Sequence, residues 1–333
     1  MVDFEYQDMT YYSIRKIYGI SIEEERTIWK ICYINKIIYI PSNCPKYNLG
    51  KVNLVNFNSV LNLLKGSCNK ANCLNRFDLR KFPIFAIFPK ILIQILMSIL
   101  KAMIVDKKNG IEIRKIIKNK YNNVNINIKT IFEFMNYIRK ETIYYLSHLY
   151  ETEPISTFNG SESYSIDETL MSHNEGSQIW VVGVIKNSNL NKVRLNLTTT
   201  RNSTYLKYFV ERYIKRSNKV VSNFCAGYAF LNQSNSGYSH LTFNHYQGQF
   251  GEGINSSSHI ESFWAFLKNN IKKIYHCIPS KNLLYFVKEG ELRYILREKS
   301  DFETLSYMET KFKYCYDGCN FDFYSEEILL NNP

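Results

Sequence analysis

Apolar residues recur at helical spacing in three stretches of the first half of the chain. The spacing predicts helices at about 89–105, 110–120 and 128–150. A polar, Asn-rich turn separates the second helix from the third, and the third carries Arg139 and Lys140. Two helices joined in this way fit a helix-turn-helix arrangement, in which both basic residues would contact DNA. They equally fit a plain helical bundle.

The pattern changes to strands after residue 163. The runs YSIDE, WVVGVIK and VRLNLTTT predict three strands, and the first ends near Asp167. There follow a helix at about 204–216, a strand ending at Asn223, a strand at about 240–245, and helices at about 259–274 and 280–298. This order predicts an α/β domain of the ribonuclease-H-like kind, with a mixed sheet and flanking helices, after a mostly α-helical region.

Changes in composition divide the chain into five segments. Residues 1–82 combine short apolar runs, which are strand candidates, with a loop-rich stretch at 44–80, and 83–150 form the helical region. A stretch rich in Glu, Ser, Asn and Gly at 151–163 predicts a linker. Residues 164–299 then form the α/β domain, and 300–333 form an acidic tail.

The longest apolar stretch, at 82–104, does not predict a membrane span. Pro89 and Lys90 interrupt it, Lys101 follows, and the mainly apolar run between them, Ile91–Leu100, has only ten residues. A membrane helix needs about 20 apolar residues. The sequence therefore predicts a buried helix that begins near Pro89, and no membrane partner.

Positive charge is concentrated in the first half. Residues 1–150 hold 23 Lys and Arg against 11 Asp and Glu, a net charge of +12, whereas 151–333 hold 19 of each. By charge alone, such an excess favours an anionic partner, either nucleic acid or an acidic membrane surface. Together with the helix-turn-helix pattern it tips the prediction towards DNA, with no membrane partner. The eight cysteines are sparse, and the polar N-terminus lacks the apolar core of a signal peptide. We therefore expect reduced thiols in an intracellular protein, in the nucleus if the source is a eukaryote.

Four blocks of the α/β domain resemble DDE transposases. They are IDET at 166–169, WVVGVI at 180–185, SNFCAGY at 222–228 and HIESFWAFLK at 259–268. The blocks are most similar to the Merlin superfamily of eukaryotic DNA transposons and to its bacterial insertion-sequence relatives. The resemblance implies an enzyme that cleaves and transfers strands of double-stranded DNA at transposon terminal inverted repeats. A homo-oligomer is a further expectation.

The resemblance also implies three carboxylates that hold Mg²⁺ or Mn²⁺. Two such ions, about 3.5–4 Å apart, stabilise the attacking and leaving oxygens of an in-line displacement. Asp167 takes the first position and Glu261 the third, and six residues separate Glu261 from Lys268. Because seven residues are close to two helical turns, Lys268 lies on the same stripe as Glu261 and can contact substrate phosphate.

Other residues of the same predicted helix are candidate DNA contacts. Trp264 either packs in the domain core or stacks on a displaced base. His259 either contacts DNA or caps the helix. Lys272 lies one turn beyond Lys268 and is a further basic candidate.

The second carboxylate is missing, because Asn223 occupies its position. No aspartate lies between Asp167 and Asp301, and the acids at 170–260 are Glu175, Glu211 and Glu252. An amide oxygen carries no charge and holds a divalent ion less firmly than a carboxylate does. We therefore expect weakened metal binding and impaired catalysis.

A zinc ribbon ahead of the helix-turn-helix is also implied by the resemblance. Cys44 looks like the start of a CPxC knuckle whose second cysteine has become Tyr47, and Cys68 and Cys73 would supply the other pair. Three thiolates without a fourth ligand make a poor structural zinc site. The sequence therefore argues against a complete zinc ribbon.

Two hypotheses follow for the whole chain. One is a transposase, or its recent fossil, and the other is a domesticated DNA-binding protein that no longer cuts. Asn223 and Tyr47 favour decay or domestication, whereas the unbroken reading frame and the Glu261–Lys268 spacing favour retained function. Terminal inverted repeats beside the gene would indicate a mobile element.

Overall fold

The computed structural model describes residues 93–121, 125–156, 162–174, 177–243, 253–276 and 278–300, with short pieces among residues 43–91, 247–251 and 303–308. The apolar runs before Asn43 and the tail beyond Met308 lie outside these residues. The chain divides into two compact units, of which one contains the helical region up to Glu141 and the other contains Thr142–Glu298.

Three helices form where the periodicity predicts them: α3 (Ile93–Ile104), α4 (Gly110–Lys120) and α5 (Ile128–Thr152). The start of α4 is fixed by a capping box. The Asn109 side chain accepts hydrogen bonds from the backbone N–H groups of Ile111 and Glu112, and the Glu112 carboxylate accepts one from Asn109 N. The helices are confirmed, while a helix-turn-helix role for α4 and α5 stays a prediction.

The apolar stretch at 82–104 contributes the buried helix α3. Leu96, Ile99 and Leu100 are fully buried in the first unit. A search of the helices in the described ranges found none with the length and apolar character needed to cross a membrane.

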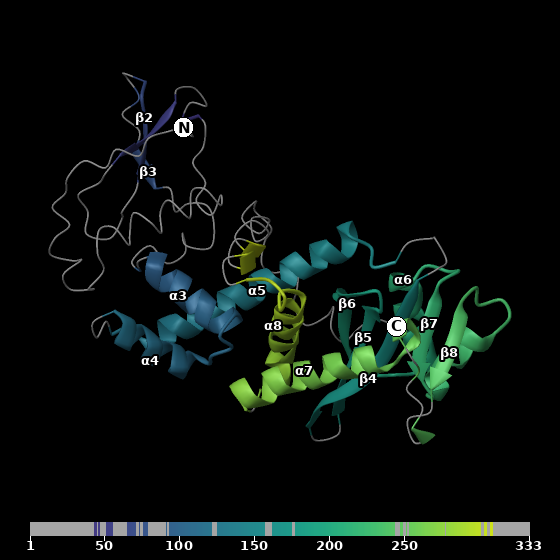
Figure 1. Ribbon diagram of the computed structural model, residues 1–333. Helices are drawn as coiled ribbons and strands as arrows, with labels where there is room; N and C mark the ends of the chain where they lie inside the picture. The colour runs from purple at the N-terminus through teal and green to yellow at the C-terminus, as the bar shows by residue number, and fades with distance from the viewer. Residues whose placement is uncertain are drawn as a thin grey trace. The chain divides into compact units, whose positions relative to one another are not determined.

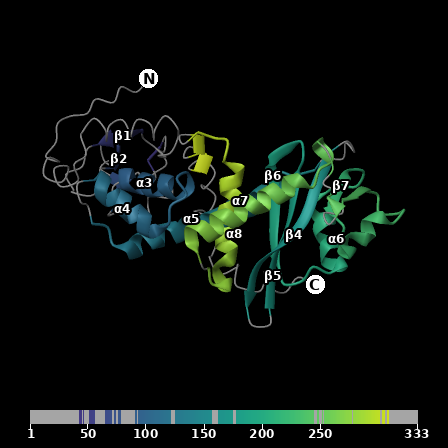
Figure 2. The same ribbon diagram turned by 60° about the horizontal axis from the view of Figure 1, so that its bottom comes forward.

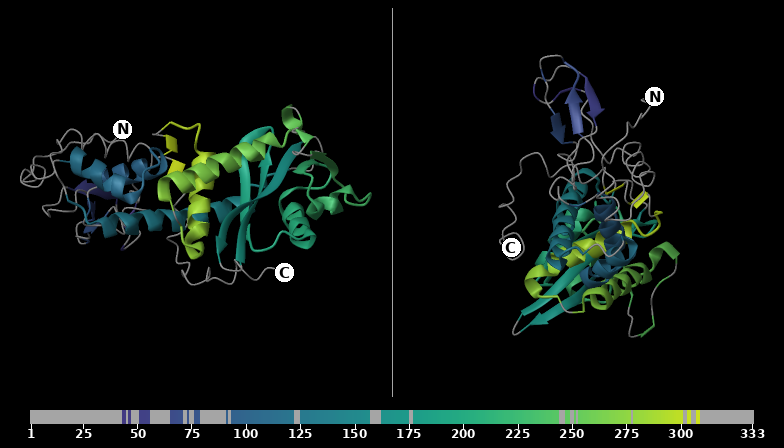
Figure 3. Two further views of the ribbon diagram at one scale, coloured as in Figure 1. Left: turned by 90° about the horizontal axis from the view of Figure 1, so that it is seen from below. Right: turned by 90° about the vertical axis from the view of Figure 1, so that its left-hand side faces the viewer.

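The stretch at 44–80 is not only loop. It contains β1 (Val52–Val55), β2 (Lys65–Cys68) and β3 (Arg76–Asp78), which form an antiparallel sheet in that order (Figure 3). The loop-rich interpretation was wrong at these positions. Strands of three or four residues among many Asn leave too few alternating apolar positions to be recognised.

A five-stranded mixed sheet forms the centre of the second unit (Figure 1). Its strands are β4 (Ser163–Asn174), β5 (Ser177–Lys186), β6 (Asn189–Thr198), β7 (Lys219–Asn223) and β8 (Ser239–Phe243), and their order across the sheet is β6-β5-β4-β7-β8. β4, β5 and β6 pair antiparallel, whereas β7 runs parallel to β4 and to β8. This arrangement is compatible with the predicted ribonuclease-H-like fold.

Helices cover both faces of this sheet. On one face, α6 (Ser203–Tyr213) and the 3₁₀ helix η2 (Ala226–Asn232) enclose a core with alternate residues of β4, β5 and β7. On the other face, α7 (Ser258–Tyr275) packs against β4 and β5, with α8 (Leu283–Ile295) beside it (Figure 2). Short 3₁₀ turns, η4 (Gly253–Asn255) and η5 (Ser280–Asn282), precede these two helices.

One strand boundary and one short helix differ from the prediction. Asp167 does not end its strand, because β4 continues to Asn174 in a hairpin with β5. The pairing of β4 with β7, however, does end beside Asp167. Its last pair is Ile166 with Ser222. The η2 helix was not predicted, since its seven residues are too few for a helical period.

Part of the predicted linker at 151–163 is packed on the second unit. Ile155 and Ser156 are each 2% exposed. The Ile155 carbonyl accepts a hydrogen bond from Tyr164 Oη (3.3 Å), and Ser156 Oγ accepts one from Lys215 N (2.6 Å). Because this stretch is mainly polar, its composition did not predict that Ile155 and Ser156 are buried.

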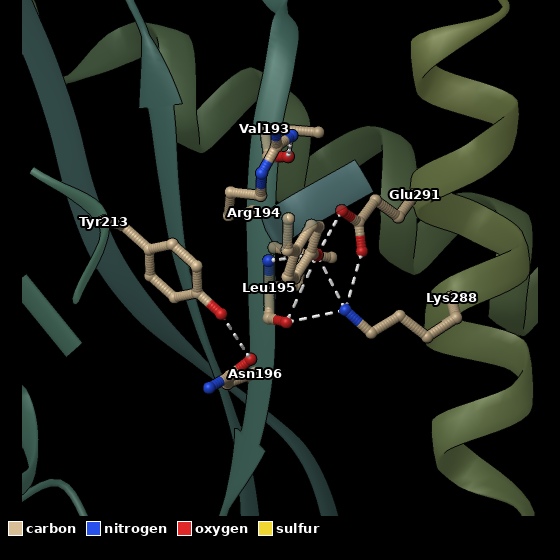
Figure 4. A network of polar contacts seen from close by, with 8 residues as sticks. Val193, Arg194, Leu195, Asn196, Tyr213, Lys288 and Glu291 are labelled. Atoms are coloured by element: carbon tan, nitrogen blue, oxygen red, sulfur yellow. Dashed lines mark hydrogen bonds and ion pairs between the residues drawn. The ribbon is translucent and has the colours of Figure 1, made fainter. Parts of the chain in front are cut away.

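Side chains cap the outer edge of β6 (Figure 4). The Leu195 N–H donates to Tyr150 Oη (2.9 Å), the Leu195 carbonyl accepts from Lys288 Nζ (2.7 Å), and the Val193 carbonyl accepts from Arg194 Nη1 (2.9 Å). Lys288 also donates to Glu291 Oε2 at 3.0 Å. Side chains from α5 and α8 thus satisfy backbone groups that an edge strand would otherwise expose.

Candidate active site

Asp167 and Asn223 meet at the end of the β4–β7 pairing. The Asn223 Nδ2 donates a hydrogen bond to Asp167 Oδ1 at 2.7 Å, and the indole Nε1 of Trp264 donates one to Asp167 Oδ2 at 3.0 Å. Both carboxylate oxygens of Asp167 therefore accept from N–H groups. Among the residues that the structure describes, no partner is found for the buried Oδ1 of Asn223.

Burial raises the pKa of the Asp167 carboxyl to about 7. Within this shift the charge of Glu168 also acts to raise the pKa, the Trp264 hydrogen bond acts to lower it, and the charge of Glu261 contributes a smaller increase. Glu261, in the first turn of α7, is thus close enough for its charge to act on Asp167. The structure brings all three predicted positions to one face of the sheet.

Trp264 is placed by a glycine on β5. Gly183 pairs with Asp167 across the β4–β5 ladder, and a Cβ at residue 183 would lie 2.6 Å from Trp264 Cη2. The missing side chain lets the indole lie against the sheet and reach Asp167. Trp264 is 5% exposed, which favours the core-packing alternative over stacking on a base.

The basic residues of α7 differ in exposure. Lys268 is half-buried, and its pKa is lowered by burial and by the nearby Lys272, while Asp167 opposes the change. Lys272 itself is exposed. His259 is half-buried, and burial lowers its pKa. Lys268 is therefore close enough to Asp167 for the two charges to interact, and DNA contacts by the three residues stay predictions.

Buried polar side chains hold the segment that leads into α7. Asn187, just after β5, donates to the Ile254 carbonyl at 2.8 Å and accepts from Ser165 Oγ at 2.8 Å. Ser165 Oγ also lies 2.8 Å from the Ser256 carbonyl. Because Ser165 is two residues before Asp167, this network fixes the start of α7, and with it Glu261, against the strand that carries Asp167.

Glu168 is a residue that the sequence reasoning missed. It follows Asp167 and therefore points to the opposite face of the sheet. Its side chain is 1% exposed, and it accepts from Tyr228 Oη at 2.7 Å and lies 3.6 Å from Cys225 Sγ. A glutamate inside a strand of otherwise apolar alternation was the available signal, since buried carboxylates need partners.

The two basic residues predicted to contact DNA from α5 differ in burial. Arg139 is 3% exposed and donates to Asn136 Oδ1 at 2.8 Å, whereas Lys140 is exposed. The expectation that Arg139 presents its charge to DNA is not met by this position. Because Arg139 is buried and Lys140 is exposed, Lys140 is the better candidate on α5.

Three cysteines of the first unit converge. The sulfur atoms of Cys44, Cys68 and Cys73 lie within 4.8 Å of one another, and those of Cys44 and Cys73 are 3.6 Å apart. The Lys70 N–H points at Cys68 Sγ at 3.4 Å. The cluster supplies three of the four ligands that structural zinc requires. Tyr47, at the place of the fourth, lies outside the described residues, and the expectation that the zinc site is incomplete stays a prediction.

The donor set around Asp167 does not fit two divalent ions. Two ions bring four positive charges, and Mg²⁺ needs oxygen ligands. Asp167 and Glu261 supply the carboxylates, but both oxygens of Asp167 are occupied by N–H donors, which cannot be ligands. The free Oδ1 of Asn223 is one neutral oxygen. As it stands, hydrogen bonds within the protein satisfy the carboxylate of Asp167 and leave the Oδ1 of Asn223 without a partner among the described residues.

The part of the chain that contains β4, β7 and α7 matches a known family model. Residues 159–294 match the ISXO2-like transposase domain. The match confirms the predicted resemblance at the level of an insertion-sequence transposase domain, while the Merlin superfamily stays a prediction. No match was found among curated proteins. The matched segment therefore contains Asp167, Asn223, Glu261 and Lys268, which come from three elements, β4, β7 and α7.

Proposed function

We propose that this protein is a transposase-like DNA-binding protein whose strand-cleaving centre is impaired by Asn223. The domain match supports a transposase-like function and implies DNA as the substrate. The basic first half of the chain, with its net charge of +12, would supply the sequence-independent attraction to phosphates.

The hydrogen bond from Asn223 to Asp167 carries the proposal. With Asp in place of Asn223, this donor would become a second carboxylate, and the two negative charges would repel each other until a cation bound between them. Asn223 removes that requirement, because its N–H stabilises the Asp167 carboxyl directly. The result is a centre that is stable without the ions that cleavage requires.

The test compares three proteins on a plasmid that carries the DNA flanking the gene. These are the parent, Asn223→Asp, and Asn223→Asp combined with Glu261→Gln. In Mg²⁺ or Mn²⁺ the parent should nick the plasmid slowly or not at all. Asn223→Asp should nick faster by at least about tenfold, because it restores a charged ligand, and the added Glu261→Gln should abolish the gain.

Robust Mg²⁺-dependent nicking by the parent would overturn the claim that Asn223 impairs the centre. Another carboxylate would then have to complete it, and Glu252 would be the first to replace. If neither the parent nor Asn223→Asp bound or cut DNA, the proposal of a transposase-like function would itself be wrong.

The domesticated DNA-binding protein is the alternative that the same observation favours. It differs from a recent fossil in its genomic setting, since terminal inverted repeats beside the gene would mark a mobile element. A salt-dependent DNA affinity together with an absence of such repeats would support domestication.

A further inference from the structure

Phe224 is placed at the surface directly beside the candidate active site. It follows Asn223, and its exposed fraction is 77%, the highest among the exposed large hydrophobic residues of the described chain. The Cys225 N–H donates to the Asn223 carbonyl at 2.9 Å, so the backbone turns tightly around Phe224 and leaves its ring at the tip of the turn.

The turn that presents Phe224 is anchored from below. Cys225 Sγ and Tyr228 Oη both lie against the buried carboxylate of Glu168, at 3.6 and 2.7 Å. Tyr228 is 1% exposed. Because the residues after Phe224 are fixed to β4, the exposed ring projects from a rigid support, and it does not fold back onto the core.

A cation lies next to the same turn. Arg201, in the loop between β6 and α6, stacks its guanidinium 4.1 Å from the centre of the Trp180 ring, and its Nη1 is 4.0 Å from Glu168 Oε1. Cys225 also feels the charge of Arg201. The Arg201 side chain is nevertheless 53% exposed, so the stacking orients the guanidinium while leaving donors for a ligand.

These features match the chemistry of an unpaired nucleotide. Single-stranded nucleic acid is bound by aromatic rings that stack on bases and by basic groups that hold the phosphates. Loops after β6 and β7 supply one group of each kind. Phe224 directly follows Asn223, and Arg201 Nη1 and Cys225 Sγ lie 4.0 and 3.6 Å from the same oxygen of Glu168, the residue after Asp167. An exposed Phe without a neighbouring cation would be an ordinary surface residue.

We propose that Phe224 and Arg201 form a binding surface for an unpaired nucleotide of the DNA strand, with Phe224 stacking on the base and Arg201 contacting the adjacent phosphate. This inference rests on the proposed function and narrows its substrate class. The preferred ligand is DNA that is single-stranded next to the candidate active site, in contrast to an intact duplex.

The experiment measures the affinity of the full chain for two labelled probes by fluorescence anisotropy. One probe is a blunt duplex, and the other is the same duplex with a short single-stranded extension that contains 2-aminopurine. The variants are Phe224→Ala, Phe224→Trp, Arg201→Gln and Arg201→Lys. Tyr208→Ala serves as the control for an exposed aromatic ring, because Tyr208 is 45% exposed on α6. Arg216→Gln is the control for an exposed arginine with an ion pair.

The parent should bind the extended probe more tightly than the blunt one. Phe224→Ala should lose about tenfold in affinity for the extended probe and little for the blunt duplex. Phe224→Trp should still prefer the extended probe to the blunt duplex. Its binding should still change the fluorescence emission of the 2-aminopurine base, as binding of the parent does. Arg201→Gln should lower the affinity for the extended probe more than Arg201→Lys does. The two control variants should bind both probes as the parent does.

Equal affinity of the parent and Phe224→Ala for the extended probe would overturn the inference while leaving the proposed function intact. So would an equal loss on both probes. Failure of the parent to bind either probe would overturn the proposed function, and this surface with it. Circular dichroism of Phe224→Ala should match the parent, because the ring makes up part of the surface and not of the core.

Discussion

At the scale of single residues, one atom distinguishes the Asn223 centre from a carboxylate triad. The Nδ2 of Asn223 donates to Asp167, where an aspartate at the same position would present a second oxygen. Position 223 therefore decides whether the local charge is balanced by a hydrogen bond or by a cation. The consequence can be measured through stability as well as through cleavage.

Without divalent metal, Asn223→Asp should destabilise the protein at neutral pH by about 1–3 kcal/mol, because two half-buried carboxyl groups would lie within hydrogen-bond distance of each other. Addition of Mg²⁺ should raise the melting temperature of this variant and leave that of the parent nearly unchanged. Thermal denaturation in chelator and in Mg²⁺ gives both values. A parent protein stabilised by Mg²⁺ as much as the variant would contradict this prediction.

His240 on β8 gives a pH-dependent prediction. Its Nε2 lies 2.9 Å from Ser222 Oγ and its Nδ1 lies 2.8 Å from Asn232 Oδ1, and burial lowers its pKa from 6.5 to about 4. The unfolded chain therefore takes up a proton at His240 before the folded protein does. Stability present above pH 6.5 is lost as the pH falls from 6.5 towards 4.

His240→Gln removes this term and should flatten the acid side of the stability profile by about 1–2 kcal/mol, less than the full pKa difference because the ring is partly exposed. Urea denaturation at several pH values compares the two proteins. Parallel curves between neutral pH and pH 4.5 would show that His240 does not contribute.

The sequence predicted the position of Asp167, Asn223 and Glu261 on the chain because each belongs to a recognisable block. It could not predict that Glu168 and Arg139 are buried. Whether a charged residue is buried depends on which partners the fold brings to it, and those of Glu168 lie about 60 residues away in η2. Such partners are visible only after the strands have been assembled.

At the scale of elements, the helices and strands with a clear period were predicted within a few residues. The exceptions share a cause. β1–β3 and η2 are too short for a period, and the length of β4 beyond Asp167 is set by its hairpin with β5. Whether these elements form, and how far they extend, depends on their pairing partners and local contacts. The sequence of a single strand does not reveal those partners.

The contact between α8 and β6 depends on the buried pair of Lys288 and Glu291. The side chain of Glu291 is fully buried, burial lowers the pKa of Lys288, and Glu291 opposes that change. Lys288→Met should leave the Glu291 carboxylate without its cation and destabilise the protein by about 3–5 kcal/mol. Urea denaturation measures this loss.

The double variant Lys288→Met with Glu291→Leu removes both charges and should recover a large part of the loss. An exposed pair, Lys129 with Glu133 on α5, serves as the control, and replacing Lys129 should have an effect below about 1 kcal/mol. If Lys288→Met and Lys129→Met were equally mild, the buried pair would not support the contact.

At the scale of the whole molecule, the family match and the compact unit have different starting points. The match begins at residue 159, whereas the second unit begins at Thr142 and includes Tyr150 and Ile155. Tyr150 Oη accepts from Lys288 and Leu195, and Tyr150 donates to Glu291. The folded domain therefore needs residues that precede its recognisable sequence.

A fragment of residues 142–298 should unfold in one cooperative transition, while a fragment of 159–298 should be less stable by several kcal/mol or fail to fold. Circular dichroism in urea compares them. Replacing Tyr150 by Phe in the longer fragment keeps the ring but removes its hydroxyl, and should give an intermediate stability. Equal midpoints for the two fragments would contradict the role given to residues 142–158.

The capped edge of β6 limits how copies of this protein can associate. The hydroxyl of Tyr150 and the ammonium of Lys288 already occupy the places where a neighbouring strand would offer its amides. A second molecule cannot lengthen the sheet on that side without first displacing two buried groups. Growth of the sheet from copy to copy, as in strand exchange or fibril formation, would have to begin at β8.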